Sequence, residues 1–130
     1  MKIKFSKLVY FFAETHYFSK DHSVLVVNIV GPLVKDNITT FEECGEEIFK
    51  SKSKWIILNF RDVSPDVDLA FLPLLGQLQK KIRGKPAHLR LSGLHPDIRK
   101  VLQDQNLVFP DELVNNLSDA LKSLPDPSSS

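Results

Sequence analysis

Two short apolar runs constrain what this chain can fold into more than any other feature. Residues 23–30 read SVLVVNIV and end at a Gly-Pro pair, and residues 55–60 read WIILNF. Both runs are too short for a typical helix and are rich in β-branched residues, which is typical of strands buried on both faces. They are therefore predicted to be the two central strands of a sheet.

The segment between the two runs is predicted to be a helix. Its apolar residues recur on one face at helical spacing, at Phe41, Cys44 and Ile48. Two overlapping capping boxes, in which a hydroxyl and a carboxylate satisfy free amides reciprocally, are predicted to open it: Thr39 with Glu42, and Thr40 with Glu43. A strand, a helix and a second strand at this spacing favour a right-handed crossover and a parallel strand pair.

The second half of the chain continues the alternation of helices and strands. A second helix is predicted from apolar residues at helical spacing: Phe71, Leu75, Leu78 and Ile82. Gly84 is predicted to end it in the C′ position that favours glycine. Residues 87–91 alternate like a strand with one wetter face. Pro96 then opens a third helix, residues 112–114 suggest a short last strand, and Asn116 caps a final helix reaching Leu124.

Together these elements predict an α/β fold in which a four- to five-strand mixed sheet carries helices mainly on one face. The aromatic-rich residues 1–18 are predicted to supply one or two strands at the sheet edge. One domain is expected over residues 1–124, because a chain of this length buries a full core. Residues 125–130, composed of proline, aspartate and serine, are predicted to be a disordered tail.

Charge and cysteine usage exclude several classes of function. The 17 Lys and Arg residues nearly balance the 16 Asp and Glu residues, and a net charge of +1 argues against nucleic acid or an anionic membrane as the partner. The single cysteine, Cys44, excludes an internal disulfide and a Cys-rich zinc site, and it fits a reducing compartment. With neither a recognisable leader nor a bilayer-length apolar run, the chain is expected in the cytoplasm.

The residues that could carry catalysis or bind nucleic acid have ordinary structural interpretations. Cys44 is expected to pack in the core, and the four histidines lack metal-ligand spacing, so no enzyme activity, metal or cofactor is expected. A basic run is expected to be the solvated end of the second helix, where cations suit the helix dipole: Lys80, Lys81, Arg83 and Lys85.

The order and spacing of these phrases resemble one known family. VLVVNIVGPL, WIILNFRDV, a helix ending in KKIRGKP, LRLSGLHPDIRKVLQDQNL and LSDAL follow one another as in the STAS domain of anti-anti-sigma factors, over residues 24–124. The resemblance implies a bacterial module for signal transduction and transcription regulation. In that family, phosphorylation of a serine between the second of these strands and the next helix controls binding to an anti-sigma factor.

The resemblance also implies where a partner would bind. The family's Asp-Ser-Ser-Gly motif falls on residues 67–70, so the implied partner-binding residues are Asp66, Val67, Asp68, Leu69 and Ala70. Asp68 replaces the phosphorylated serine and either imitates phosphoserine or caps the helix. Because Pro73 has no amide to donate, the helix is expected to begin nearer Leu72. Ser64 is a possible surrogate phosphosite.

The expected function is a non-enzymatic module that binds an anti-sigma factor or a kinase-like regulator through residues 62–70 and the exposed face of the second helix. A rival interpretation is a small α/β enzyme or ligand-binding domain that uses Asp62, Asp66 and Asp68 for metal or phosphate, because ligands bind at the carboxyl ends of parallel strands. A third is a STAS subunit of a lipid-transport ATPase complex.

Overall fold

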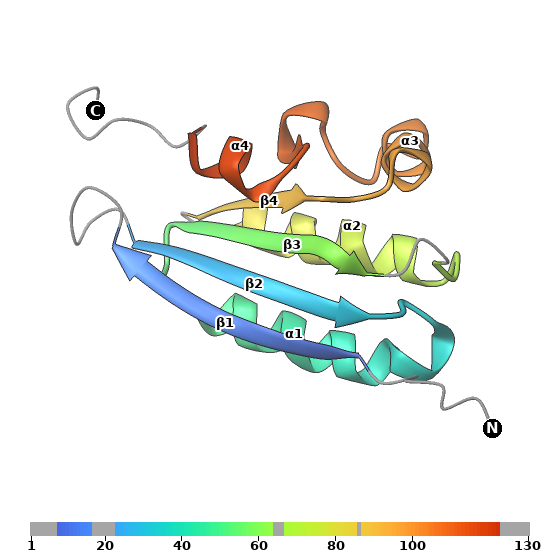
Figure 1. Ribbon diagram of the computed structural model, residues 1–130, viewed down its shortest axis with the longest axis horizontal. Helices are drawn as coiled ribbons and strands as arrows, with labels where there is room; N and C mark the ends of the chain where they lie inside the picture. The colour runs from blue at the N-terminus through green and yellow to red at the C-terminus, as the bar shows by residue number, and fades with distance from the viewer. Residues whose placement is uncertain (1–7, 17–22, 64–66, 86, 123–130) are drawn as a thin grey trace.

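The protein forms a single mixed sheet of five strands in the order β1-β2-β3-β4-β5, as the computed structural model in Figure 1 shows. The structure describes residues 8–16, 23–63, 67–85 and 87–122. The strands are β1 (Val9–His16), β2 (Ser23–Gly31), β3 (Trp55–Val63), β4 (His88–Ser92) and β5 (Leu113–Val114). β1 runs antiparallel to β2 and the other neighbours are parallel, so the predicted mixed sheet is confirmed.

The two apolar runs are interior strands, as predicted. β2 and β3 each have a strand on both sides, and residues 56–60 of β3 are all buried. Val24 and Ile57 face one side of the sheet while Val27 and Leu58 face the other, and all four side chains have no exposed surface. The mostly apolar composition of these strands follows from this, because each covers a core on both faces.

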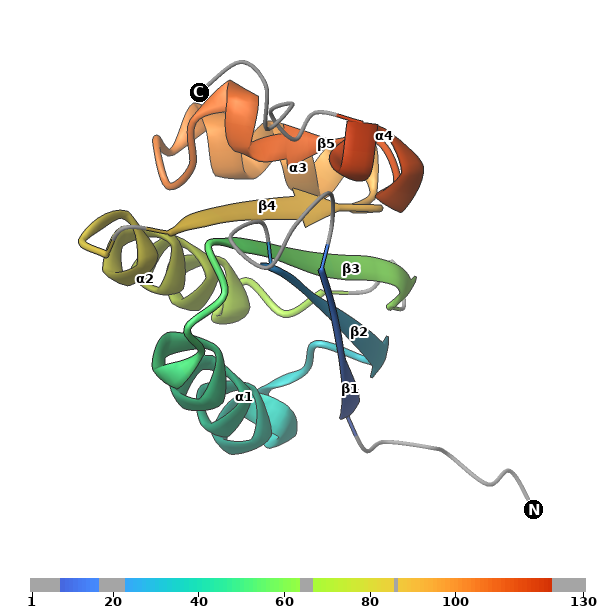
Figure 2. The ribbon, with the colours of Figure 1, turned by 90° about the vertical axis from the view of Figure 1, so that its left-hand side faces the viewer.

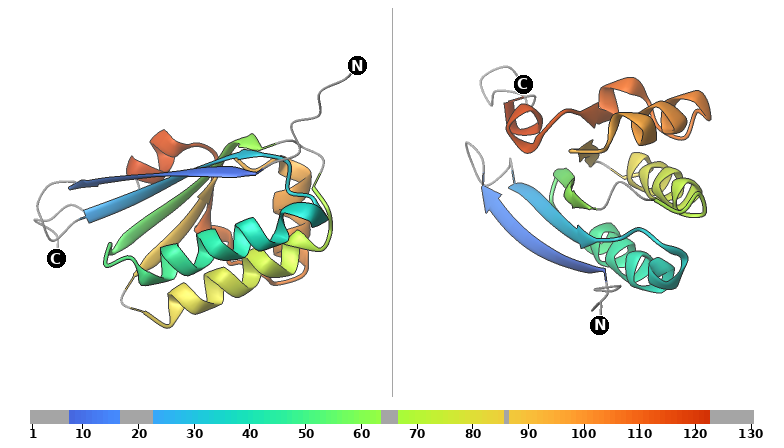
Figure 3. Two further views of the ribbon diagram at one scale, coloured as in Figure 1. Left: turned by 90° about the horizontal axis from the view of Figure 1, so that it is seen from below. Right: turned by 45° about the vertical axis from the view of Figure 1, so that its right-hand side comes forward.

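Two long helices cover one face of the sheet. α1 (Ile38–Lys50) and α2 (Phe71–Arg83) lie side by side beneath it in the left panel of Figure 3. Their apolar residues join those of the strands in one core, with Phe41 and Ile48 from α1 and Leu75 and Ile82 from α2. The helical periodicity therefore identified the correct faces of both helices.

The opposite face is covered only in part. Ala120 of α4 (Leu117–Lys122) packs into a smaller core with Val24, Val26 and Ile57. α3 (Pro96–Asp104) follows β4, and His95 caps it by accepting a hydrogen bond from the amide of Asp97. Both of these short helices lie beyond β4 in Figure 2. The two long helices share one face of the sheet, so the prediction of helices mainly on one face is confirmed. The length and apolarity needed to cross a membrane are found in no helix of the described residues.

Two predictions about helix ends were wrong. α1 begins at Ile38 after the short 3-10 turn η2 (Lys35–Asn37), so Thr39 and Thr40 lie inside its first turn and form no capping box. In this turn the Asn37 side chain donates to the carbonyl of Pro32 at 3.0 Å, a local hydrogen bond that stabilises the chain just before α1. Gly84 has a φ of −76° and is the C-cap, not a left-handed C′ glycine.

Candidate partner-binding site

The segment from Val67 to Ala70 connects β3 to α2 near the carboxyl end of β3. Val67 is half-buried and packs against the main core, whereas Leu69 and Ala70 are exposed. Leu69 has 73% of its surface exposed, the largest value among the exposed large apolar side chains in the described part of the chain. Asp66 and Ser64, the other predicted site residues here, lie outside the described residues. At the start of α2, Leu69 therefore presents an exposed apolar side chain and Asp68 an acidic one.

Asp68 is held by three hydrogen bonds. Its amide donates to the carbonyl of Leu33 at 2.9 Å, and its carbonyl accepts from the amide of Phe71 at 2.9 Å. Its carboxylate Oδ1 accepts from the amide of Ala70 at 3.0 Å. The side chain therefore stabilises the turn that leads into α2, while Ala70, not Asp68, occupies the N-cap position. Oδ2 accepts no hydrogen bond from residues that the structure describes.

α2 begins at Phe71, one residue before the predicted start. Pro73 is therefore the third residue of the helix, in the first turn, where amides have no partner inside the helix and a proline is tolerated. The Phe71 ring meets the Phe41 ring edge-on at 5.5 Å between centroids. This buried contact anchors the segment that precedes the helix.

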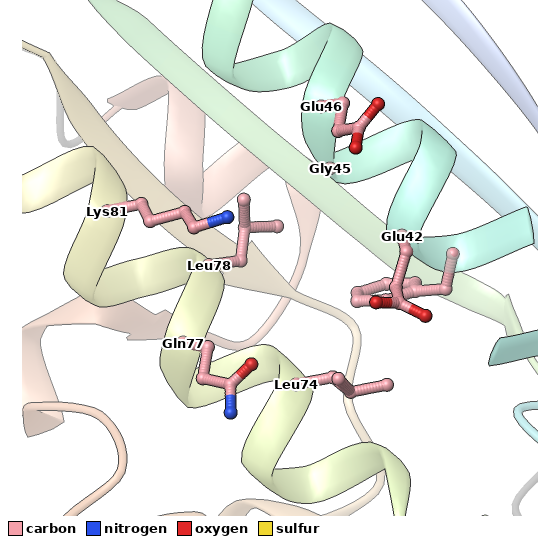
Figure 4. A pocket seen from close by; sticks show the side chains of 8 residues that line it. Glu42, Gly45, Glu46, Leu74, Gln77, Leu78 and Lys81 are labelled. Carbon is pink, nitrogen blue, oxygen red and sulfur yellow. The ribbon is translucent and has the colours of Figure 1, made fainter. Parts of the chain in front are cut away.

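A narrow groove of about 90 Å³ runs between α1 and α2. Figure 4 shows Leu78 and Lys81 extending from α2 toward α1, and Glu42 and Glu46 along the α1 side. The residues that line it are Phe41, Glu42, Gly45, Glu46, Leu74, Gln77, Leu78 and Lys81. The groove therefore borders α2 from Leu74 to Lys81, within the helix that follows residues 67–70.

A second pocket, of about 220 Å³, lies at the carboxyl ends of the parallel strands. Its lining residues are Phe60, Arg61, Val63, Val67, Gly93, Leu94, His95 and Ile98. Gly93 has a φ of +75°, and a Cβ there would lie 2.9 Å from the backbone nitrogen of Arg61. Only glycine satisfies both conditions, so Gly93 lets the chain after β4 approach β3 closely. Val67 belongs to this pocket as well as to the predicted partner-binding residues.

A polar row that sequence reasoning missed crosses the sheet beside this pocket. Asn59 Nδ2 donates to Asn28 Oδ1 at 2.9 Å, and Ser92 Oγ donates to Asn59 Oδ1 at 3.4 Å. Asn59 Oδ1 also accepts from the amide of Arg61 at 3.3 Å, at the start of the chain that leads to Val67. The signal was present, because one asparagine interrupts each of the two apolar runs.

The residues considered for enzyme chemistry form no catalytic or metal-binding cluster in the part of the chain that the structure describes. Asp62 is exposed and lies 4.0 Å from Arg61, Asp66 is outside the described residues, and no three potential metal ligands gather among those described. Cys44 is buried, and burial, followed by the charge of Glu47, raises its pKa to about 12. A thiol with so high a pKa is a poor nucleophile.

The predicted solvated basic end of α2 also makes contacts that the sequence did not indicate. Arg83 forms an ion pair with the buried Glu112 of η3 (Pro110–Glu112), and Lys85 donates to the carbonyls of Phe49 and Ser51. Both contacts join segments about thirty residues apart or more, which helical periodicity does not reveal. Lys80 and Lys81 are exposed, as expected.

Comparison with known proteins gives one family and a consistent fold. The model of the family described as STAS domain matches residues 18–120. An anti-sigma factor antagonist from Mycobacterium paratuberculosis is similar with a TM-score of 0.69 and 18% identity, over 91% of this chain and 96% of that one. Phosphorylated SpoIIAA, a Bacillus cell fate determinant, gives 0.61 and 18%, over 85% and 96%. A sulfate transporter family protein from Wolinella succinogenes gives 0.62 and 19%, over 76% and 82%. No curated protein matches the chain.

Proposed function

The chain belongs to the STAS domain family, and we propose on that basis that it is a non-enzymatic protein-interaction module of the anti-anti-sigma type. The proposed partner is an anti-sigma factor or a kinase-like regulator in the cytoplasm. The fold shared with an anti-sigma factor antagonist over nearly the whole of both chains supports this choice. The proposed contact surface consists of residues 67–70 and the exposed side of α2 beside the groove, and we call it the docking surface.

The exposure of Leu69 is the observation that carries this proposal. A leucine that is 73% exposed contributes almost nothing to folding, yet it stands between Asp68 and the first turn of a helix that is anchored in the core. An exposed apolar side chain gains free energy when a partner removes it from water, and a rigid support lowers the entropy lost on binding. Burial of Leu69 in a partner pocket would supply affinity, and the neighbouring carboxylate would select a basic partner surface.

Asp68 would give the module a permanent negative charge in place of a phosphate. Its Oδ1 accepts a hydrogen bond from the amide of Ala70, and its Oδ2, which accepts none from the described residues, would meet a partner cation. A negative charge at this position lies near the positive end of the α2 dipole. It would have the same electrostatic effect as a phosphoserine there. The proposed module therefore acts without the family's serine phosphorylation cycle, unless Ser64 serves as a surrogate site.

Titration calorimetry with the anti-sigma factors and kinase-like regulators of the same genome tests the proposal. Leu69→Asn is expected to weaken binding by about tenfold or more, since a hot-spot truncation costs over 1.4 kcal/mol. Phe11→Asn is the matched control, because Phe11 is 60% exposed on the edge strand β1, away from the docking surface. If Phe11→Asn abolishes binding while Leu69→Asn does not, the partner binds instead at the aromatic strand around Tyr10, and the proposed surface is wrong. Tyr17, the other residue considered for that surface, is outside the described residues.

A second candidate function, a subunit of a lipid-transport ATPase complex, draws on the same family. The likeness to a sulfate transporter family protein shows that this fold also occurs in transport proteins. The genes beside the one encoding this chain distinguish the two candidates. An anti-sigma or kinase gene supports the signalling module, whereas an ATPase and permease operon supports the transport subunit.

A further inference from the structure

β1 presents an open strand edge. It is the first strand in the sheet order and pairs only with β2, so alternate backbone amides and carbonyls of β1 face away from the sheet. In the right panel of Figure 3, no helix or strand of the described residues lies beyond it. β1 is 8 residues long, whereas β5, at the other edge of the sheet, has 2. β1 is therefore the long free edge of the domain.

The first part of β1 lacks the features that usually protect such an edge. Many proteins place a lysine, a proline or a β-bulge on an edge strand, which prevents pairing with a strand of another molecule. Residues 9–13 read VYFFA and contain neither a charged residue nor a proline. Their register with β2 is continuous, so no bulge interrupts the strand. This edge is therefore free to accept a further strand.

Apolar side chains are exposed on both faces of β1. Tyr10 packs against the main core, and its ring lies 5.4 Å from the ring of Phe12, on the same face. Val9 and Phe11 alternate with these residues and therefore point to the other face. The exposed fractions are 42% at Val9, 60% at Phe11 and 41% at Phe12. A partner that lies on one face of the sheet would cover only one of these sets, whereas a strand added at the edge borders both.

α4 does not cover Phe11. The smaller core around Ala120 includes Val24 and Val26 of β2, but none of its described members belongs to β1. Phe11 lies opposite Asn28, further along β2 and beyond this core. Its ring is therefore held on a regular strand but belongs to neither core of the described residues.

We propose that two copies of this chain pair through β1, with the two strands antiparallel about a two-fold axis at Phe11. In this register Phe11 faces Phe11 of the second copy, Tyr10 faces Phe12, and Val9 faces Ala13. Apolar side chains then meet at each of the five positions, and residues 8–13 carry no charge that would repel the same residues of the second copy.

The identity of the partner strand follows from this self-complementarity. A two-fold interface requires that one surface fit a copy of itself, and the apolar run at residues 9–13 does so in the antiparallel direction. One contact also satisfies the open edges of both molecules and joins their two sheets into one. This contact is separate from the docking surface, because β1 and α2 lie on opposite sides of the view in Figure 2.

Sedimentation equilibrium of the whole chain tests the pairing. The apparent mass of the unmodified chain is expected to double as its concentration rises from micromolar to millimolar. Phe11→Glu and Phe11→Lys are each expected to stay a single copy over this range, because like charges meet at the two-fold axis. An equimolar mixture of the two variants is expected to regain the double mass, since glutamate then faces lysine. Phe49→Glu is the matched control and should dimerise like the unmodified chain, because Phe49 is 44% exposed on α1.

Hydrogen exchange of the unmodified chain is a second measurement that needs no variant. The backbone amides of β1 are expected to exchange more slowly at high concentration than at low concentration, whereas the amides of α4 should exchange equally. This measurement decides alone if circular dichroism shows that the Phe11 variants do not fold.

Several results would overturn the proposal. The first is an unmodified chain that stays a single copy up to millimolar concentration. The second is a Phe11→Glu or Phe11→Lys variant that dimerises like the unmodified chain, which would place the contact elsewhere. A mixture of the two folded variants that stays a single copy, or slower exchange outside β1 only, would equally exclude the antiparallel pairing of β1 with itself.

Discussion

The guanidinium of Arg83 donates two hydrogen bonds to the carboxylate of Glu112, from Nε to Oε2 at 2.9 Å and from Nη2 to Oε1 at 2.5 Å. Glu112 also accepts from the Gln79 amide and from the backbone amide of Phe109. The carboxylate is buried, so these donors replace the water that it loses on folding. They tie the end of α2 to η3 and thereby hold the short strand β5 against β4.

The Glu112 contacts predict a specific dependence of stability on pH. Burial by itself raises the pKa of Glu112, but the hydrogen bonds from Arg83, Phe109 and Gln79 and the charge of Arg83 lower the pKa overall. A carboxyl whose pKa is lowered on folding stabilises the protein above its unfolded pKa, and this stabilisation is lost as pH falls through the folded pKa. Glu112→Gln should therefore cost about 1–3 kcal/mol near neutral pH. The difference from the unmodified chain should shrink in acid.

Urea unfolding at a series of pH values measures this effect. Glu46→Gln, which neutralises an exposed carboxylate on α1, is the control and should follow the unmodified chain within about 0.5 kcal/mol. A Glu112→Gln deficit that stays constant from neutral to strongly acid pH would show that the ionised pair is not the source of the stability.

The core contact of α2 predicts a large effect at Leu78. Its side chain is buried in the main core beside α1, so Leu78→Ala should lower the free energy of unfolding by about 2–5 kcal/mol. Leu69→Ala makes the same chemical change at an exposed position and should cost less than about 0.5 kcal/mol. Equal losses at the two positions would contradict the assignment of Leu69 to the docking surface.

The two roles of Asp68 can be separated by substitution. Asp68→Asn keeps an acceptor for the amide of Ala70 but removes the charge, whereas Asp68→Ala and Asp68→Ser remove the charge and alter that hydrogen bond. If the charge governs partner binding, all three should change affinity in the same direction by about tenfold. Only Asp68→Ala should lose the full stability of the bond, about 0.5–1.5 kcal/mol. If affinity for the partner is unchanged while stability is lost, Asp68 only stabilises the turn before α2.

Gly93 and Gly84 provide a matched pair of glycine substitutions. Gly93→Ala forces an alanine into a φ of +75° and brings its Cβ to 2.9 Å from Arg61, so it should cost about 1–3 kcal/mol. Gly84 has a φ of −76°, and Gly84→Ala should stay within about 1 kcal/mol of the unmodified chain. Thermal unfolding followed by circular dichroism compares the two. If Gly93→Ala does not lower the melting temperature, the chain after β4 does not approach β3 closely.

The proposal of a non-enzymatic interaction module predicts no stabilisation by divalent cations. An ion that binds only the folded chain must raise the melting temperature by mass action. We expect no saturable shift with Mg²⁺ or Ca²⁺. A shift of several degrees that Asp66→Asn removes would instead favour the rival interpretation, in which Asp62, Asp66 and Asp68 bind a metal.

Much of the fold could be predicted from the sequence because it depends on local patterns. The two apolar runs predicted β2 and β3, since strands covered on both faces tolerate few polar residues. Helical spacing predicted α2 and its buried face. The caps at His95 and Asn116 were also predictable, because each side chain bonds an amide two or three residues further along the chain. The location of the docking surface came from the family resemblance rather than from these patterns.

Only the tertiary structure decided which distant groups meet. At the end of α2, where the sequence predicted only solvated cations, Arg83 pairs with the buried Glu112 of η3, and Lys85 donates to carbonyls at the end of α1. The same packing of η3 and β4 around α2 buries Gln79 and leaves its Oε1 without a described donor. Periodicity reports which face of an element is apolar. The partner of a polar side chain depends on how the parallel crossovers bring separate elements together, and on the cost of burying such a group unpaired.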